Sequence, residues 1–291
     1  MTTDLNEANG WIPEPKSSEV LTKVYATSAV ESVARRVTMT APTVSVPRFE
    51  SDGADIVAEH AVIPVQDATL DEVVLREVKF ANRFAISIED QRDALVDVLA
   101  QKKLAWANSF GLKLDNAALG VTTAQDGTDT APFESVYFAA NAAGNVTQTA
   151  GALQYEMLNE LFEAIEDGDY DGNLVVVAHP AFKGAMRNLK DADGNRVVAD
   201  PLGAGVPTIF GHELRFSKGA RTSAAATHQP EGNPLLIVGN REHMILGVRD
   251  GVESAIADHR WEYDEREVKM RARRAFKVAT PEAFRVLEKV A

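Results

Sequence analysis

Cysteine is absent from the 291 residues of this chain. Its absence excludes disulfide bonds, thiolate metal sites and cysteine nucleophiles together. Long apolar runs are lacking as well, since no stretch of the sequence approaches the ~18 apolar residues that a transmembrane helix needs. The first residues carry Asp4, Glu7 and Glu14 without an apolar stretch, so we expect no secretory signal and no membrane association.

Positive charge is in deficit. The chain has 30 basic against 43 acidic residues, which gives a net charge of -13. A surface of this kind disfavours tight wrapping of nucleic acid. It suits the wall of a container over which a polyanion has to move, although acidity for solubility alone explains the composition equally well.

The overall balance is that of an ordinary folded protein. Hydrophobic residues make up 45% and charged residues 25% of the chain. A chain of this length buries its own core as one large domain or two interleaved ones. We find no internal repeat that would indicate a solenoid.

The stretch from Leu70 to Gly120 is the centre of the predicted architecture. Its first third alternates between apolar and charged residues, which predicts a strand. The apolar face of this strand holds Val74, Val78, Phe80, Phe84 and Ile86. Ser87 and Asp90 have the spacing of a capping box, which predicts that a helix follows. If it runs from Ile88 to Asn116 it is about 43 Å long at ~1.5 Å per residue, so we interpret it as a spine.

The segments before this stretch look like extensions of a body. Residues 1–43 are predicted to be an N-terminal arm, in which Trp11-Ile12-Pro13-Glu14-Pro15 is extended because its prolines forbid a helix. A short helix is expected between Ser17 and Val37. Residues 44–84 indicate a long antiparallel hairpin, and two strands alone need a partner surface. An edge hairpin folded back on its own domain is the alternative that the pattern leaves open.

The rest of the chain mixes helices and strands without regular βαβ alternation, so the predicted class is α+β. Helices are expected at 154–167 and 180–189. Strands are expected at 135–138, 174–178, 235–238, 244–248 and 267–278, with a strand or helical turn at 284–290. Arg274 falls on the apolar side of its strand, where it needs a carboxylate or carbonyl partner, and we predict that it is a structural clamp.

No motif in the sequence carries a recognisable reaction. The segment from His212 begins like a zinc-protease helix but has Phe216 at the second ligand position. The turn that starts at Asp167 begins like a calcium loop, but its twelfth position is Ala178. We therefore predict no catalytic, cofactor-binding or metal-binding residue and no enzyme activity. A soluble α+β enzyme that uses His179, after a buried strand, is the alternative from another class.

The order of these segments resembles that of the major capsid proteins of tailed bacteriophages with the Hong Kong 97-type fold. Three segments of the first half carry the resemblance: the arm is Trp11 to Ala34, the extended loop is Val44 to Phe84 with the Ala58-Glu59-His60 turn, and the junction into the spine helix is Phe84 to Gly120. In the second half, Leu174 to Lys190 resembles the start of the axial domain and Glu267 to Pro281 the closing peripheral strand. Thr208 to Leu214 resembles a "T-L-x-G-x-P-V" segment, with Glu213 in place of proline. The order over nearly the whole chain carries the resemblance, because no single motif is diagnostic.

The resemblance implies a major capsid protein that self-assembles into pentamers and hexamers of an icosahedral shell around double-stranded DNA. It divides the chain into an arm (1–43), an extended hairpin loop (44–84), a peripheral domain with the spine helix (85–171 and 252–291) and an axial domain (172–251). Scaffolding, portal and decoration proteins are expected partners, and the packaged DNA is held without sequence-specific binding. The expected location is the virion, assembled in the cytoplasm of the bacterial host. An encapsulin-type compartment is the alternative within the same fold.

The same resemblance directs attention to residues that would contact neighbouring copies. We expect these to be Trp11, Glu59, His60, Arg76, Lys79, Arg271 and Arg273. Some relatives cross-link a hairpin lysine to an asparagine of the next subunit. Here Lys79 is the only lysine between Lys23 and Lys102, and no asparagine follows Asn240, so we expect no covalent cross-links. Because the chain begins almost directly at the arm, we expect any scaffold to be a separate protein or dispensed with.

Overall fold

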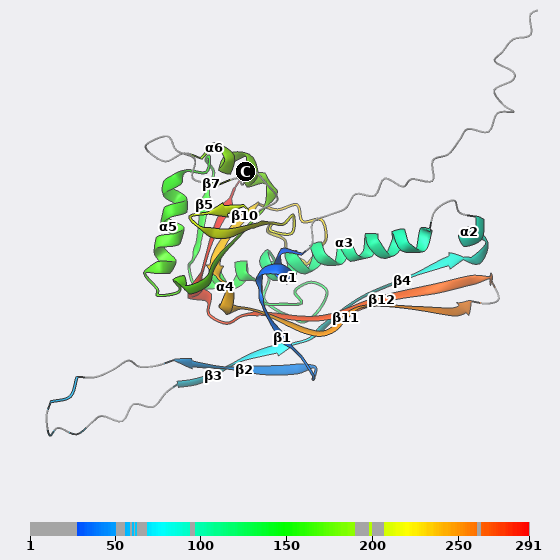
Figure 1. Ribbon diagram of the computed structural model, residues 1–291, viewed down its shortest axis with the longest axis horizontal. Helices are drawn as coiled ribbons and strands as arrows, with labels where there is room; N and C mark the ends of the chain where they lie inside the picture. The colour runs from blue at the N-terminus through cyan, green and yellow to red at the C-terminus, as the bar shows by residue number, and fades with distance from the viewer. Residues whose placement is uncertain are drawn as a thin grey trace, which may run out of the picture.

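Three β-sheets and a long helix make up the protein (Figure 1). The computed structural model describes residues 28–50, 56–58, 60, 62, 69–93, 97–189, 198–199, 207–260 and 263–290. The sheets have the strand orders β1-β11-β12-β4, β5-β13-β10-β6-β9-β8-β7 and β2-β3. Helices and strands are mixed without regular alternation, which confirms the predicted α+β class.

The four-stranded sheet is built around one long hairpin. Its strands are β1 (Arg35–Thr38), β11 (Met244–Arg260), β12 (Glu265–Val278) and β4 (Val78–Ser87). β11 and β12 pair antiparallel, and β1 adds to β11 in parallel. The prediction ended β11 at Val248. The strand continues because pairing with β12 extends it through residues 251–256, which are exposed and carry no buried pattern that a sequence could reveal.

The predicted spine is two helices, not one. α2 (Ile88–Asp93) ends before α3 (Val98–Leu119), and Asp97 between them has a non-helical ψ of 88°. The Asp97 carboxylate accepts a hydrogen bond from the backbone N–H of Ala100 at 3.0 Å, so it caps a new helix start. α3 has 22 residues, about 33 Å at ~1.5 Å per residue, and lies along the four-stranded sheet (Figure 1).

The seven-stranded sheet is buried on both faces at its two central strands, β6 and β10. Its strands are β5 (Val146–Thr149), β13 (Phe284–Lys289), β10 (Leu235–Asn240), β6 (Leu174–Ala178), β9 (His212–Phe216), β8 (Thr208–Ile209) and β7 (Val198–Ala199). Every residue of β6 and β10 is buried, as their continuous apolar runs predicted. The predicted helix at 154–167 is α5 (Tyr155–Glu166), which covers one face, and α6 (Lys183–Asn188) lies beside it.

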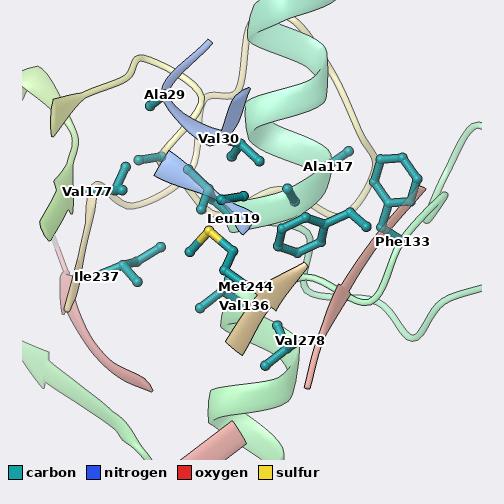
Figure 2. Packing of buried hydrophobic residues seen from close by; sticks show 14 of the residues in the cluster. Ala29, Val30, Ala117, Leu119, Phe133, Val136, Val177, Ile237, Met244 and Val278 are labelled. Atoms are coloured by element: carbon teal, nitrogen blue, oxygen red, sulfur yellow. The ribbon is translucent and has the colours of Figure 1, made fainter. Parts of the chain in front are cut away.

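A shared core joins this sheet to α3 on its other face. Figure 2 shows Leu119 of α3, Val177 of β6, Ile237 of β10 and Met244 of β11 converging in this core. Val30 of α1 (Ala29–Val33) also packs there and is fully buried. The last part of the predicted arm is therefore a core element, because α1 and β1 bring apolar residues into the body.

The strand predicted at 135–138 is wrong. α4 (Val136–Ala142) occupies this position, and the Ser135 hydroxyl accepts a hydrogen bond from the backbone N–H of Phe138 at 3.0 Å. The Val-Tyr-Phe run suggested a strand, but the serine cap and the alanines that follow stabilise a helix. The segment after Thr280, left open between strand and helical turn, is the strand β13.

The hairpin forms a separate two-stranded sheet. β2 (Thr43–Glu50) and β3 (Thr69–Arg76) pair from Thr43 opposite Arg76 to Glu50 opposite Thr69, and Figure 1 shows the ribbon extending from the body. The predicted single strand through residue 77 is thus broken into β3 and β4, which belong to different sheets. The prediction placed Val74 on the apolar face of this strand, but in β3 it is Val73 and Leu75 that are buried. The alternation of inward and outward residues shifts by one position at the break between β3 and β4.

Candidate intersubunit surfaces

Glu77 fixes the point at which the hairpin leaves the body. It lies between β3 and β4, and its Oε1 accepts hydrogen bonds from Arg249 Nη1 at 2.6 Å and Arg273 Nη1 at 3.2 Å. Its Oε2 is buried without a hydrogen-bond partner among the described residues. Hydrogen bonding to Glu77 raises the pKa of Arg249, so this group stays charged. The cluster holds β3, β11 and β12 together at the root of the hairpin.

Arg48 makes a second attachment of the hairpin. From β2 it donates to the backbone carbonyl of Ala279 at 2.8 Å and pairs with Asp71 of β3 at 2.7 Å. Beneath this contact, Val73 and Leu75 pack on Met39 and on β11 and β12 in a small apolar cluster. The base of the hairpin is therefore docked on the body. Among the described residues, β2 and β3 pair with each other and with no further strand, and a two-stranded sheet is marginally stable by itself.

Arg274 is 5% exposed and links four elements. Its Nε donates to Glu31 Oε1 at 2.9 Å, and its Nη1 donates to the backbone carbonyl of Asp250 at 2.6 Å. The guanidinium also lies 5.5 Å from the ring centre of Phe110 on α3. The sequence analysis predicted a carboxylate or a carbonyl as the partner of Arg274. Both are present: the carboxylate is that of Glu31 on α1, and the carbonyl is that of Asp250 on β11.

Asp115 on α3 is a functional residue that the sequence analysis missed. Its carboxylate is buried and accepts hydrogen bonds from the Ser28 and Ser217 hydroxyls and from the backbone N–H groups of Ala29 and Val30. Burial raises the pKa of Asp115, and these hydrogen bonds act in the opposite direction. The site attaches the start of α1, where the arm enters the body, to α3. The one signal in the sequence is a charged residue inside an apolar run.

The neighbouring Asn116 anchors the loop that follows β9. Its Nδ2 donates to the carbonyls of Gly219 at 3.1 Å and Arg221 at 2.9 Å, and its Oδ1 accepts from the backbone N–H of Thr227 at 3.1 Å. The last turns of α3 therefore hold both the arm and this loop in fixed positions. The spine helix is in this respect an organising element, as its length suggested.

The structure brings some of the expected contact residues together and leaves others apart. Lys79 and Arg273 are register partners on β4 and β12, and Arg271 lies two positions before Arg273 on β12. Arg273 contacts Glu77, and Arg271 pairs with Glu253 at 2.7 Å within the same chain. Arg76 and Lys79 are exposed at the root of the hairpin.

The remaining expected contact residues are on the hairpin and the arm. His60 is exposed and has a positive φ of 64°, which is typical of a tight turn. Trp11 and Glu59 lie outside the described residues.

An open groove runs between α3 and the edge strand β4. Its volume is about 750 Å³. Four aromatic rings line it, from Phe80, Phe84, Trp106 and Phe110, and the Trp106 and Phe110 rings stack with centroids 5.4 Å apart. Lys79, Lys102 and Lys113 stand around this apolar floor. Apolar floors with a charged rim are typical of sites that bind another polypeptide.

Nothing in the described chain assembles a reaction centre. His179 Nδ1 accepts a hydrogen bond from the backbone N–H of Ala181 at 3.1 Å, so the side chain caps the short helix that follows β6. Burial and the charges of Arg221 and Lys218 lower its pKa to about 4. Within the described ranges, no three acidic or histidine side chains meet in a way that could hold a metal ion. None of the described helices has the length and apolar character needed to span a membrane.

The fold just described is that of the Hong Kong 97-type shell proteins, a class that works by assembly and not by catalysis. The chain belongs to the phage capsid family, whose model matches residues 9–289. It is a structural component of a virion, and neither the encapsulin nor the enzyme alternative is favoured.

Solved structures share this fold over the full length of the chain. A chain from Mycobacterium phage Bobi superposes with a TM-score of 0.80 at 20% identity and covers 100% of both chains. A chain from Gordonia phage Cozz gives a TM-score of 0.76 at 16% identity and covers 98% of this chain and 94% of that chain. The capsid of an empty GTA particle, computed with C5 symmetry, gives 0.70 at 16% identity and covers 99% and 98%. Comparison with curated protein sequences gives no match.

Proposed function

We propose that this protein forms pentamers and hexamers that close into an icosahedral shell around double-stranded DNA. The observation that carries the proposal is the hairpin sheet of β2 and β3. Its base is fixed on the body by Glu77, Arg48 and a small apolar cluster, while β2 and β3 pair with no further strand among the described residues. A ribbon of this kind is marginal alone, so a neighbouring copy supplies the layer that it lacks.

The division of the chain follows from this assembly. We propose the arm (1–43), the extended loop (44–84), the peripheral domain with α3 (85–171 and 252–291) and the axial domain (172–251) as its functional parts. β13 of the third range pairs with β10 of the fourth, so these two domains are joined by strand pairing as well as by the shared core. Such continuity supports a body that moves as one unit while arm and loop engage neighbours.

Contacts between copies are proposed at the hairpin and at the charged root of β4 and β12. His60, Arg76 and Lys79 are exposed there. Trp11 and Glu59 join this proposal from the sequence. Arg271 and Arg273 are partly satisfied by Glu253 and Glu77 within the chain, so they contribute fewer free hydrogen-bond donors. Arg274 is proposed as a clamp within the subunit.

The net charge of -13 supports a lumen that holds DNA without binding its sequence, because an acidic wall repels phosphate and lets the genome slide during packaging. Separate scaffolding, portal and decoration proteins complete the proposed particle, which assembles in the cytoplasm of the bacterial host.

Sedimentation velocity and negative-stain microscopy of the expressed chain test the proposal. We expect pentamers, hexamers or closed particles, and nuclease-resistant DNA in particles taken from infected cells. A compact monomer or a small discrete oligomer that builds no particles under any assembly condition would contradict it.

A further inference from the structure

A polar pocket lies where α1, β1 and η4 (Arg241–His243) meet. Its volume is about 520 Å³, and three of its eight lining residues are arginines. Arg35 and Arg36 come from the start of β1, and Arg241 comes from the start of η4. All three are exposed. The chain as a whole carries a net charge of -13, so this pocket is a local exception to its acidity and a candidate site for an anion.

Two of these arginines are held by backbone carbonyls at the end of α1. Arg36 Nε donates to the carbonyl of Glu31 at 3.1 Å, and Arg241 Nη2 donates to the carbonyl of Ser32 at 3.4 Å. A carbonyl fixes the position of a guanidinium without cancelling its charge. Because a guanidinium has more N–H groups than these contacts use, both side chains keep donors for a ligand.

Two carboxylates also line the pocket and cancel its charge only in part. Glu31 already pairs with Arg274 at 2.9 Å, and the Arg274 side chain is 6% exposed, so this carboxylate is engaged on the side of the core. Glu242 lies 3.8 Å from Arg35, and both side chains are 51% exposed. An exposed pair at this distance is weak, so a ligand with more negative charge can take the place of Glu242 at Arg35.

The number and kind of donors favour a phosphate group. Guanidinium forks bind phosphate oxygens with two N–H groups at once, and phosphate offers more acceptor oxygens than a carboxylate does. Asn173, which ends η2 (Asp171–Asn173), adds a side-chain amide to the wall. The volume falls in the range of about 300–1,000 Å³ for pockets that hold organic ligands, so the pocket has room for a phosphate that is joined to a sugar.

We propose that this pocket binds the phosphate of a nucleotide unit through Arg35, Arg36 and Arg241. Two sources share this chemistry, the backbone of duplex DNA and a free nucleotide. The first source rests on the proposed shell function, in which the chain encloses packaged DNA. A backbone contact reads no base, which agrees with DNA that is held without sequence specificity. One phosphate site on an acidic surface is weak and salt-dependent, so the DNA still moves along the wall.

Fluorescence anisotropy of a labelled short DNA duplex, titrated with the unassembled full-length chain at low salt, tests the proposal. The variant Arg35→Gln/Arg241→Gln removes two of the three charges and leaves Arg36 in place at the end of α1. We expect its affinity to fall about tenfold or more, and the slope of log K against log salt to fall by about two.

The matched control is Arg92→Gln/Arg187→Gln, which makes the same change in net charge at two exposed arginines outside the pocket. It should change the affinity by less than about threefold, because charges away from the ligand are screened. Arg35→Lys/Arg241→Lys keeps the charge but not the paired N–H groups, so it should recover only part of the affinity.

Competition with deoxyadenosine monophosphate distinguishes the two sources. Displacement of the duplex at a comparable concentration of phosphate groups assigns the pocket to free nucleotides. A duplex that stays bound assigns it to the DNA backbone.

Three results would overturn the proposal. These are an equal loss of affinity in the pocket and control variants, no binding of either the duplex or the nucleotide, and tighter binding of poly-glutamate than of both, which would make an acidic protein segment the occupant. The binding assay needs no particles, so its failure leaves the shell function intact. A chain that binds DNA through this pocket but builds no particles counts against the shell function alone.

Discussion

The carboxylate of Asp115 on α3 accepts a hydrogen bond from the backbone N–H of Ala29, 86 positions earlier in the chain, at 3.0 Å. The same carboxylate accepts from Val30 at 3.1 Å, so one side chain satisfies two of the orphan amides at the start of α1. Through this contact the start of α1 is held at a fixed point on the spine helix.

Replacing Asp115 with asparagine should destabilise the subunit. The amide would turn a donor toward backbone N–H groups that need an acceptor, at a site that is only 1% exposed. We expect a loss of about 2–4 kcal/mol in the free energy of unfolding, measured by urea denaturation of dissociated subunits. Asp129→Asn is the control, since its carboxylate is 89% exposed, and it should change stability by less than about 1 kcal/mol. Equal effects would contradict the anchoring role.

Two arginines on β12 allow a matched test of the clamp. Arg274→Met leaves the half-buried carboxylate of Glu31 and the Asp250 carbonyl without their donor, so we expect a loss of about 3–5 kcal/mol. Arg271→Met breaks a pair whose side chains are 41% and 49% exposed, and we expect a loss below about 1 kcal/mol. Thermal unfolding of both variants gives the comparison, and a larger loss at Arg271 would refute the assignment.

His179 should make stability depend on pH in the acidic range. Its pKa is lowered from 6.5 to about 4 in the folded protein, so the unfolded chain binds the proton first as the pH falls. The folded state is therefore disfavoured progressively between pH 6.5 and about pH 4. His179→Asn keeps a cap for Ala181 and removes the titration, so its stability should fall less over this range.

His179→Ala separates the two roles of this side chain. It removes both cap and titration, so at every pH it should be about 1 kcal/mol less stable than His179→Asn, which lacks only the titration. Urea unfolding across the pH range decides the matter; identical slopes for the original chain and His179→Asn would count against the assignment.

Shortening the hairpin should separate folding from assembly. Deleting Asp55 to Ala68 with a short glycine bridge keeps the pairing of β2 with β3 and the attachments at Arg48 and Glu77. We expect folded subunits with an unchanged circular dichroism spectrum that do not form normal closed shells in the electron microscope. Particles like those of the full-length chain would show that the hairpin tip is not an assembly element.

Covalent cross-linking between copies is not expected. Denaturing gels of mature particles should show one band with the mobility of a single chain. Lys79→Arg, which keeps the charge but removes the amine that an isopeptide bond needs, should give the same gel pattern. A ladder that disappears in Lys79→Arg would establish the cross-link that we predict to be absent.

The local predictions succeeded where a segment's own pattern decides its structure. β6 and β10 are continuous apolar runs buried on both faces, and α5 has an apolar stripe at helical spacing. β12 alternates along most of its length because one of its faces packs against the core. These elements needed no knowledge of their partners, since burial on one or two faces leaves its period in the sequence.

The predictions failed at two local helix caps and where a distant partner decides. The helix break at Asp97 depends on a cap, and the Val-Tyr-Phe run after Ser135 is drawn into a helix by its cap and its core neighbours. β11 continues past Val248 only because β12 lies beside it. The strand predicted to run through residue 77 is divided into β3 and β4 at Glu77. Two arginines that bind Glu77, Arg249 and Arg273, lie more than 170 positions away in the sequence.

The sequence by itself determined the α+β class, the buried strands, the main helices and the order of segments that indicates a shell protein. Periodicity, composition and turn residues are local properties, so a single chain displays them without being folded. Only the tertiary structure decided that the hairpin is docked by Glu77 and Arg48, that Asp115 holds the arm, and that α3 and β4 enclose an aromatic groove. Each of these depends on side chains brought together from separate segments of the chain, and such contacts leave no period in the sequence.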